Sequence, residues 1–139
     1  MIVLDTNVLS ELMKAEPAEQ VATWIGKQPA TSLFVTAINE AEVLYGVRLM
    51  PEGPRRSGFE AATKAMFEED FASRVLAFGR DAADAYADIS VARRRLGRPI
   101  SQFGAQIAAI ARSAGAVLAT RNVANFEGCS LKLVDPWGC

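Results

Sequence analysis

The sequence predicts an α/β protein in which a parallel sheet is covered by helices on both faces. Two observations carry this prediction. Short apolar runs of strand length alternate along the chain with longer, Ala-rich segments of helical spacing, and this alternation is typical of parallel strands joined by helices. The short runs are also apolar at consecutive positions, as expected of strands that are buried on both faces of a sheet.

The strands are predicted from five apolar or β-branched runs: Ile2–Leu4, Leu33–Val35, Val75–Phe78, Val117–Ala119 and Leu131–Val134. The helices are predicted from six segments between these runs: Val8–Lys14, Ala18–Lys27, Ala37–Met50, Phe59–Phe71, Asp81–Leu96 and Gln102–Ala114. Prolines stand at the edges of these segments, where a missing backbone N–H is tolerated. The turn-rich stretch from Pro51 to Gly58 is predicted to be a loop between two helices.

The length of 139 residues predicts a single domain over 1–139, because a chain of this size buries most of its apolar surface in one fold. With 22% charged residues and a net charge of −1, the chain is neither disordered nor broadly basic, so a polyanionic partner would be bound locally. The apolar runs are short and the N-terminus has no basic leader. We therefore expect a cytoplasmic protein without a membrane span or secretory signal.

The chain contains no histidine, which excludes several kinds of catalytic site. A Ser-His-Asp triad and a Cys-His pair both need an imidazole base. The two cysteines, Cys129 and Cys139, lie near the C-terminus without the spacing of a zinc site. Acid–base chemistry must therefore use carboxylates, or a metal ion held by carboxylates.

Ligands of such sheets bind beyond the carboxyl ends of the strands, so the residues that follow each apolar run are candidates for a site. Asp5, Thr6 and Asn7 follow the first run and supply a carboxylate and two further oxygen-bearing side chains. All three residue types are also good helix N-caps, so capping is an alternative role. Capping, however, requires only one of them.

Glu42 is a second candidate because the predicted helix around it places a carboxylate on an apolar face. The apolar residues of this face are expected to be Ile38, Ala41, Tyr45 and Leu49. Glu42 lies four residues after the first of them, and a carboxylate there is costly unless a cation or hydrogen bonds compensate its charge. The alternative is a side chain at the edge of the face, whose stem packs while its carboxylate reaches water.

Gly104 breaks the local pattern at the start of the last predicted helix. Ser101 is expected to cap this helix, and a capping box would have Glu or Gln at position 104. Glycine within a helix costs about 1 kcal/mol relative to alanine. The apolar face of the helix is predicted to consist of Phe103, Ile107, Ile110 and Ala114. One explanation of the glycine is close backbone packing in a patch of small residues with Ala108 and Ala111.

Further candidates follow the fourth apolar run, where Thr120, Arg121 and Asn122 stand. The amide oxygen of Asn122 suits a hard cation, although asparagine is also common in turns. The densest positive run of the chain consists of Arg93, Arg94, Arg95 and Arg98. This run is either a solvated helix face or, together with Arg121, a track that contacts the phosphates of RNA beside the site.

Five segments together resemble the PIN-domain toxins of VapBC-type toxin–antitoxin modules, including the FitB-like branch. They are MIVLDTNVLSEL at the start, AEVLYGV around Glu42, IAAIA in the last predicted helix, LATRNVANFEG, and the closing VDPW. Each motif is weak alone, but their order and spacing extend the resemblance over essentially the whole chain.

The resemblance implies a three-layer α/β/α PIN-like fold and an endoribonuclease that cleaves RNA phosphodiesters at a cluster of acidic residues binding Mg²⁺ or Mn²⁺. Asp5 and Glu42 match two acidic positions of the family and are the expected metal ligands. Hard divalent cations prefer such oxygen ligands. Thr6, Asn7 and Thr120 are expected to support the two carboxylates.

Two positions of the implied catalytic set depart from the family pattern. Gly104 stands where the family usually has aspartate, and Asn122 occupies a position that is Asp in some relatives and Asn in others. Relatives with Asn there often have an acid nearby in the loop, where this chain has Asn125. Each missing carboxylate removes a charge and a ligand from the ion. We therefore predict weak metal binding and attenuated nuclease activity.

The resemblance also implies partners, namely a VapB-like antitoxin that contacts operator DNA through its own domain, and a second copy of the chain in a homodimer. The segments Ala18–Lys27 and Gly58–Phe71 are candidate partner surfaces. One alternative function is a catalytically inactive PIN-domain partner that acts in antitoxin binding and operon autoregulation. A weaker alternative, from the alternating pattern alone, is a flavodoxin-like or receiver-like binding domain, but the chain lacks a phosphate loop and the acidic pair of a receiver.

Overall fold

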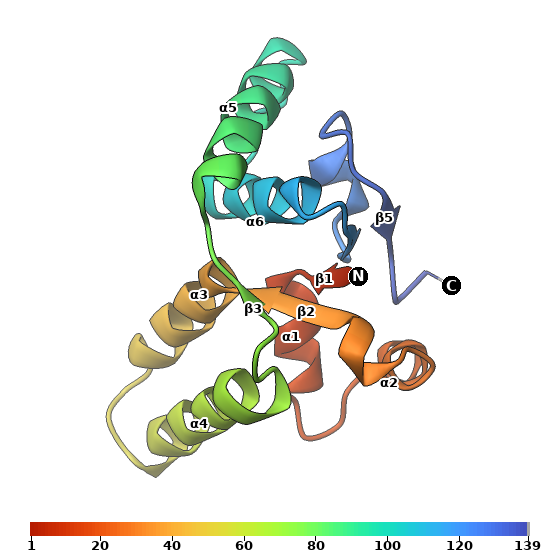
Figure 1. Ribbon diagram of the computed structural model, residues 1–139. Helices are drawn as coiled ribbons and strands as arrows, with labels where there is room; N and C mark the ends of the chain where they lie inside the picture. The colour runs from red at the N-terminus through yellow and green to blue at the C-terminus, as the bar shows by residue number, and fades with distance from the viewer. Residues whose placement is uncertain (139) are drawn as a thin grey trace.

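A computed structural model, which describes residues 1–138, has a five-stranded sheet at its centre (Figure 1). The strands are β1 (Ile2–Leu4), β2 (Leu33–Thr36), β3 (Val75–Leu76), β4 (Val117–Ala119) and β5 (Leu133–Val134). All paired strands run parallel in the order β3-β2-β1-β4-β5. The predicted parallel sheet is confirmed, and Cys139 lies outside the described residues.

Helices cover both faces of this sheet. They are α1 (Thr6–Leu12), α2 (Glu19–Gly26), α3 (Ala37–Arg48), α4 (Pro54–Ala65), α5 (Arg80–Arg95) and α6 (Gln102–Ser113). Three short helical turns join them: η1 (Ala30–Ser32), η2 (Met66–Asp70) and η3 (Val123–Phe126). Figure 1 shows α5 and α6 on one side of the sheet and α1, α3 and α4 on the other, which confirms the three-layer α/β/α arrangement.

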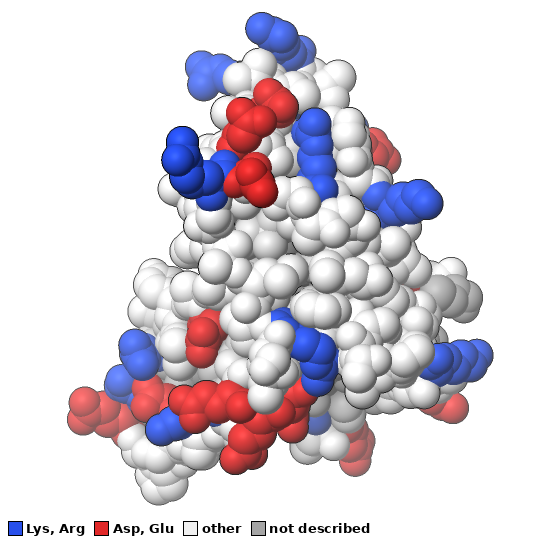
Figure 2. Space-filling model, viewed as in Figure 1, with Lys and Arg blue, Asp and Glu red and all other residues white. Residues whose placement is uncertain are grey.

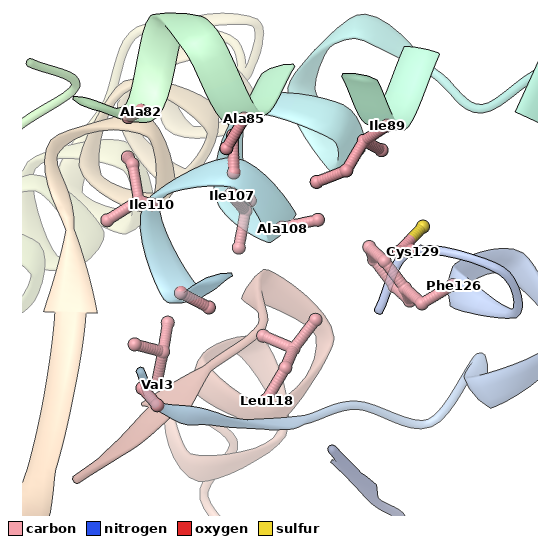
Figure 3. Close-up of a cluster of buried hydrophobic side chains, with 13 residues drawn as sticks. Val3, Ala82, Ala85, Ile89, Ile107, Ala108, Ile110, Leu118, Phe126 and Cys129 are labelled. Atoms are coloured by element: carbon pink, nitrogen blue, oxygen red, sulfur yellow. The ribbon is translucent and has the colours of Figure 1, made fainter. Parts of the chain in front are cut away.

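Two apolar cores follow from the alternation of side chains along the strands. Val3 of β1 and Leu118 of β4 pack with Ile89 and Ile107 of the α5–α6 layer (Figure 3). The next residue of β1, Leu4, belongs to the second core, on the side of α1 and α3. Because successive side chains of a strand point to opposite faces, the consecutive apolar residues of β1 serve both layers.

Several predicted boundaries are wrong by a few residues. Helix α4 begins at Pro54, inside the stretch predicted to be a loop, because proline is tolerated in the first turn of a helix. The strand at β3 ends at Leu76 rather than Phe78, and β5 begins at Leu133 rather than Leu131. The ends of such short strands depend on backbone hydrogen bonds to the neighbouring strands. An apolar run in the sequence does not reveal where those bonds stop.

The predicted apolar face of α6 is also wrong at both of its ends. Phe103 is 44% exposed and Ala114 lies in the exposed C-terminal cap. The buried residues of α6 are Ala105, Ile107, Ala108, Ala109, Ile110 and Ala111. Small residues dominate this set because α6 packs closely against α5 on one side and the sheet on the other. The N-cap role of Ser101 is confirmed, since its hydroxyl accepts a hydrogen bond from the Gly104 backbone N–H.

The strand order places the candidate residues together. The chain runs outward from β1 through β2 to β3, and then crosses to β4 and β5 on the opposite side of β1. Ligands of parallel sheets bind at such a reversal, beyond the carboxyl ends of the central strands. Asp5 and Thr120 directly follow β1 and β4, and Thr36 is the last residue of β2. No helix within residues 1–138 is long and apolar enough to cross a membrane.

Candidate active site

A cavity of about 620 Å³ opens beyond the carboxyl ends of the central strands. It brings together seven of the residues predicted from the sequence: Asp5, Thr6, Asn7, Glu42, Gly104, Arg121 and Asn122. Arg93 also borders it, whereas Arg94, Arg95 and Arg98 do not. The geometry therefore gathers the two predicted metal ligands and most of their predicted support into one cavity.

Asp5 lies at the floor of this cavity and is held by two hydrogen bonds. Its Oδ1 accepts from the Thr6 backbone N–H at 2.8 Å, and its Oδ2 accepts from the Thr120 hydroxyl at 2.8 Å. Burial raises the pKa of the Asp5 carboxyl above its ordinary value of 3.8, and these two hydrogen bonds oppose the rise. No lysine or arginine within residues 1–138 forms an ion pair with it. Asp5 therefore caps α1 and also presents an uncompensated carboxylate to the cavity.

Glu42 reaches the same cavity from α3 and is positioned by Thr6. The Thr6 hydroxyl donates to Glu42 Oε1 at 2.8 Å and accepts from the Asn39 amide at 2.9 Å. Asn39 is fully buried and accepts from the backbone N–H and hydroxyl of Thr36 through its Oδ1. Burial raises the pKa of the Glu42 carboxyl, the Thr6 hydroxyl opposes that rise, and the nearby Asp5 charge adds to it.

The apolar face that the sequence predicted for the helix around Glu42 is wrong. Tyr45 and Leu49 are 64% and 68% exposed, and the buried residues of α3 are Asn39, Val43 and Val47. Asn39 is buried because its amide joins Thr36 to Thr6, a role that an apolar pattern does not reveal. Glu42 is half-buried beside this face, which matches the edge position that the sequence left open.

Thr120 and Asn7 connect the loop after β4 to the start of α1. The Thr120 hydroxyl accepts from the Asn122 backbone N–H at 3.1 Å while it donates to Asp5. The Asn7 side chain donates to Thr120 Oγ1 at 3.4 Å and accepts from the Arg121 backbone N–H at 3.3 Å. The predicted supporting residues thus form one hydrogen-bonded network around Asp5.

The protein-family model described as PIN domain matches residues 2–127 of this sequence. The chain is 41% identical to VapC ribonuclease Y4jK of Sinorhizobium fredii, over 99% of this chain and 98% of that protein. It is 31% identical to toxin FitB of Neisseria gonorrhoeae, over 99% of each chain. A chain of the FitAB complex bound to the IR36 DNA fragment superposes with a TM-score of 0.92 at 30% identity, over 100% of this chain and 97% of that one. The chain belongs to the PIN-domain family.

Position 104 of this PIN domain has no carboxylate, although it borders the cavity. A Cβ atom there would lie 2.9 Å from Ser101 Oγ and 3.3 Å from Ile100 Cγ1. The close contacts at Gly104 thus come from the residues just before the helix rather than from a patch with Ala108 and Ala111. Ser101 Oγ ends a short, rotatable side chain, so a larger residue could be accommodated if this hydroxyl turned away.

Arg93 does not lie on a solvated helix face in this PIN domain. Its side chain is buried, and its Nη1 donates to the carbonyl oxygens of Glu127 at 2.8 Å and Ala124 at 3.4 Å. The run of arginines in the sequence did not reveal this burial, because the burial comes from the loop around η3, which contacts the end of α5. Arg94, Arg95 and Arg98 are exposed. Figure 2 shows Lys and Arg side chains dispersed over one face of the molecule, with acidic side chains gathered near α4.

The PIN-domain cavity also contains residues that the sequence analysis did not single out, among them Glu11, Lys14 and Trp137. Glu11 is buried, and its carboxylate accepts from the Ala18 backbone N–H and from Lys14 Nζ, each at 2.9 Å. The Ala18 hydrogen bond and Lys14 lower the pKa of Glu11, so it is compensated where Asp5 is not. The i,i+3 spacing of Glu11, in the last turn of α1, and Lys14, just beyond it, was the available signal.

The donor set of this PIN domain fits a divalent cation in kind but not in number. Asp5 and Glu42 supply uncompensated carboxylate oxygens, which hard cations prefer. Within residues 1–138, however, no group of three acidic, histidine or cysteine side chains is close enough to hold a metal ion. Two carboxylates leave most of the coordination sphere to water and substrate.

Proposed function

We propose that this chain is the toxin component of a type II toxin–antitoxin module, with an endoribonuclease site that is attenuated by Gly104. One observation carries the proposal: Asp5 and Glu42 share a cavity in which threonine hydroxyls orient both carboxylates, and within residues 1–138 no third acidic group is placed to hold a metal ion with them. The relatives named VapC ribonuclease and toxin FitB support the class of activity and the class of module.

The residues of the cavity have separate roles in this proposal. Asp5 and Glu42 would hold Mg²⁺ or Mn²⁺, and Thr6 and Thr120 keep the carboxylates aimed into the cavity. When bound, the cation supplies a Lewis acid at the phosphate and a water of lowered pKa. Asn122 offers a neutral oxygen ligand at the edge of the cavity.

Cations at the rim of the cavity would bind the substrate. Lys14 and Arg121 border the cavity, and both are exposed. Their charges attract the phosphates of RNA, so a protein with a net charge of −1 can hold a polyanion at this one place. Arg93 is excluded from this role in the proposal because its guanidinium is committed to backbone carbonyls.

The expected partners are a VapB-like antitoxin and a second copy of the chain. The solved FitAB complex is bound to DNA, and we expect this chain to contact operator DNA only through its antitoxin. An RNA substrate and an operator-binding partner would support a cytoplasmic location. Co-purification with a co-expressed VapB-like antitoxin, followed by light scattering, would test both the complex and the homodimer.

A second function is favoured by the incomplete acidic cluster. In this alternative the chain is a catalytically inactive PIN-domain partner that binds antitoxin and contributes to operon autoregulation. The persistence of an oriented Glu42 argues against a site abandoned long ago, because a half-buried carboxylate is costly without a cation. Activity of variants at position 104 separates the two functions.

The test is calorimetric titration of Mn²⁺ into the parent chain, Gly104→Asp and Gly104→Ala, followed by cleavage of a single-stranded RNA. The alanine variant is the matched control, because it adds the same Cβ atom beside Ser101 without a carboxylate. We expect Gly104→Asp alone to bind Mn²⁺ tightly and to cut RNA in a reaction that EDTA stops. A parent chain that cuts as fast as Gly104→Asp would overturn the attenuation, and an inert Gly104→Asp would favour the regulatory partner.

A further inference from the structure

Arg121 and Trp137 form a cation–π pair beside the active-site cavity. The guanidinium carbon of Arg121 lies 5.0 Å from the centre of the Trp137 ring. Both residues border the cavity that holds Asp5 and Glu42. They come from the segments that follow two neighbouring strands, Arg121 after β4 and Trp137 after β5. The fold therefore brings a planar cation and an indole ring together beside the two carboxylates.

The backbone on each side fixes this pair in place. The Arg121 N–H donates to Asn7 Oδ1 at 3.3 Å, which ties it to the helix that begins beside Asp5. The Trp137 N–H donates to Asp135 Oδ1 at 2.9 Å, and Pro136 between them is buried. These hydrogen bonds hold the backbone of both residues beside the cavity.

The chemistry of the pair suits a nucleobase. A guanidinium group is planar, and Arg121 is exposed, so its side chain is accessible to a ligand in the cavity. Trp137 is half-buried and keeps part of its ring at the cavity. Proteins bind unstacked RNA bases on aromatic rings and on arginine planes, whereas a base inside a duplex is covered by its neighbours.

We propose that Arg121 and Trp137 form a stacking site for one unpaired nucleobase of RNA, next to the phosphate that reaches Asp5 and Glu42. This inference rests on the proposed function and names its substrate as unpaired nucleotides, in single strands or loops. Both side chains would stack on the base, whereas only Arg121 carries a charge that attracts phosphate. The two contributions can therefore be separated by substitution.

The chain offers a clean optical test because it contains two tryptophans. The other tryptophan, Trp24, borders a separate hollow at α2, which is also lined by Gln20, Thr23 and Lys27. The Trp24→Phe variant therefore reports on Trp137 alone, and the Trp137→Phe variant reports on Trp24 alone. Both are titrated in EDTA, which prevents cleavage, with a single-stranded RNA of about eight nucleotides and with the same strand annealed to its complement.

We expect the single strand to quench the fluorescence of Trp24→Phe and to leave that of Trp137→Phe unchanged. The duplex should bind more weakly and quench less. Arg121→Lys, made in the Trp24→Phe background, keeps the charge but loses the plane, and it should weaken binding of the single strand by about tenfold. Its salt dependence should match that of the parent, because the number of phosphate contacts is unchanged.

Three results would overturn the proposal: an unquenched Trp24→Phe variant, equal binding by Arg121→Lys, or equal binding of duplex and single strand. Arg121 is exposed, so we expect its replacement by lysine to leave the folded core unchanged. The outcome is independent of catalysis. RNA that quenches Trp137 while Gly104→Asp remains inert would support stacking and reject the nuclease, and an active Gly104→Asp without quenching would do the opposite.

Discussion

The Thr6 hydroxyl lies 2.8 Å from Glu42 Oε1 and is the direct link between the first helix and the second acidic residue of the cavity. The same hydroxyl accepts from Asn39, whose amide is bonded to Thr36 at the end of β2. Thr6 therefore joins two strand ends and one catalytic candidate through a single oxygen atom. A helix-capping sequence after a strand has become the support of a carboxylate 36 residues away.

We expect Thr6→Val to destabilise the protein by about 1–3 kcal/mol, because the buried Asn39 amide loses its acceptor. Valine keeps the shape of threonine, so the loss reports on the hydroxyl. Thr6→Ser keeps the hydroxyl and should retain most of the stability. Urea unfolding of the three proteins measures the difference, and a serine variant as unstable as the valine variant would show that the methyl group matters instead.

Glu42→Gln is expected to change how the stability of the metal-free protein depends on pH. Burial raises the pKa of Glu42 above 4.5, so the folded protein binds its proton more tightly than the unfolded chain. The stability that Glu42 contributes is therefore complete below its unfolded pKa and is lost as pH rises through the folded pKa. Glutamine cannot ionise and still accepts a hydrogen bond from Thr6, so it avoids this loss.

The measurement is the free energy of unfolding in urea with EDTA, taken at about pH 4 and about pH 7 for both proteins. The variant should gain stability relative to the parent between the two values. A difference that stays constant with pH would contradict a raised Glu42 pKa. The cost of an uncompensated carboxylate is also the reason that a cation is expected to bind there.

The sequence predicted the positions of the strands well because buried parallel strands are apolar at consecutive positions. Asp5, Asn7 and Thr120 could be grouped in advance because all of them follow a central strand. Trp137 could not, since its link to the cavity is a cation–π contact with Arg121, from the loop after the neighbouring strand β4, and the sequence does not show that contact. Asn39 was missed because its burial depends on hydrogen bonds, and hydropathy gives those no weight.

Arg93→Met is expected to destabilise the protein by about 2 kcal/mol. It removes the donor to the Glu127 and Ala124 carbonyl oxygens, and hydrogen bonds from a charged group contribute about 1.5–3 kcal/mol. The loss is moderated because Arg93 Nε is itself buried without a hydrogen-bond partner among residues 1–138. Arg93→Lys keeps the charge but not the fork and should be intermediate. Equal stability of all three proteins, measured by urea unfolding, would mean that the η3 loop holds its position without this side chain.

Gly104→Ala tests whether the glycine is retained for packing. Alanine is favoured in a helix by about 1 kcal/mol, but its Cβ would lie 2.9 Å from Ser101 Oγ and displace the hydroxyl that caps α6. Loss of an N-cap costs about 1 kcal/mol, so we expect Gly104→Ala to be nearly neutral in the parent chain.

In the Ser101→Ala background the cap is already absent, and the same substitution should stabilise the protein by about 1 kcal/mol. Thermal unfolding of the four proteins completes the cycle. Equal effects of Gly104→Ala in the two backgrounds would mean that Ser101 does not oppose a side chain at position 104, and that the missing carboxylate is not explained by the cap.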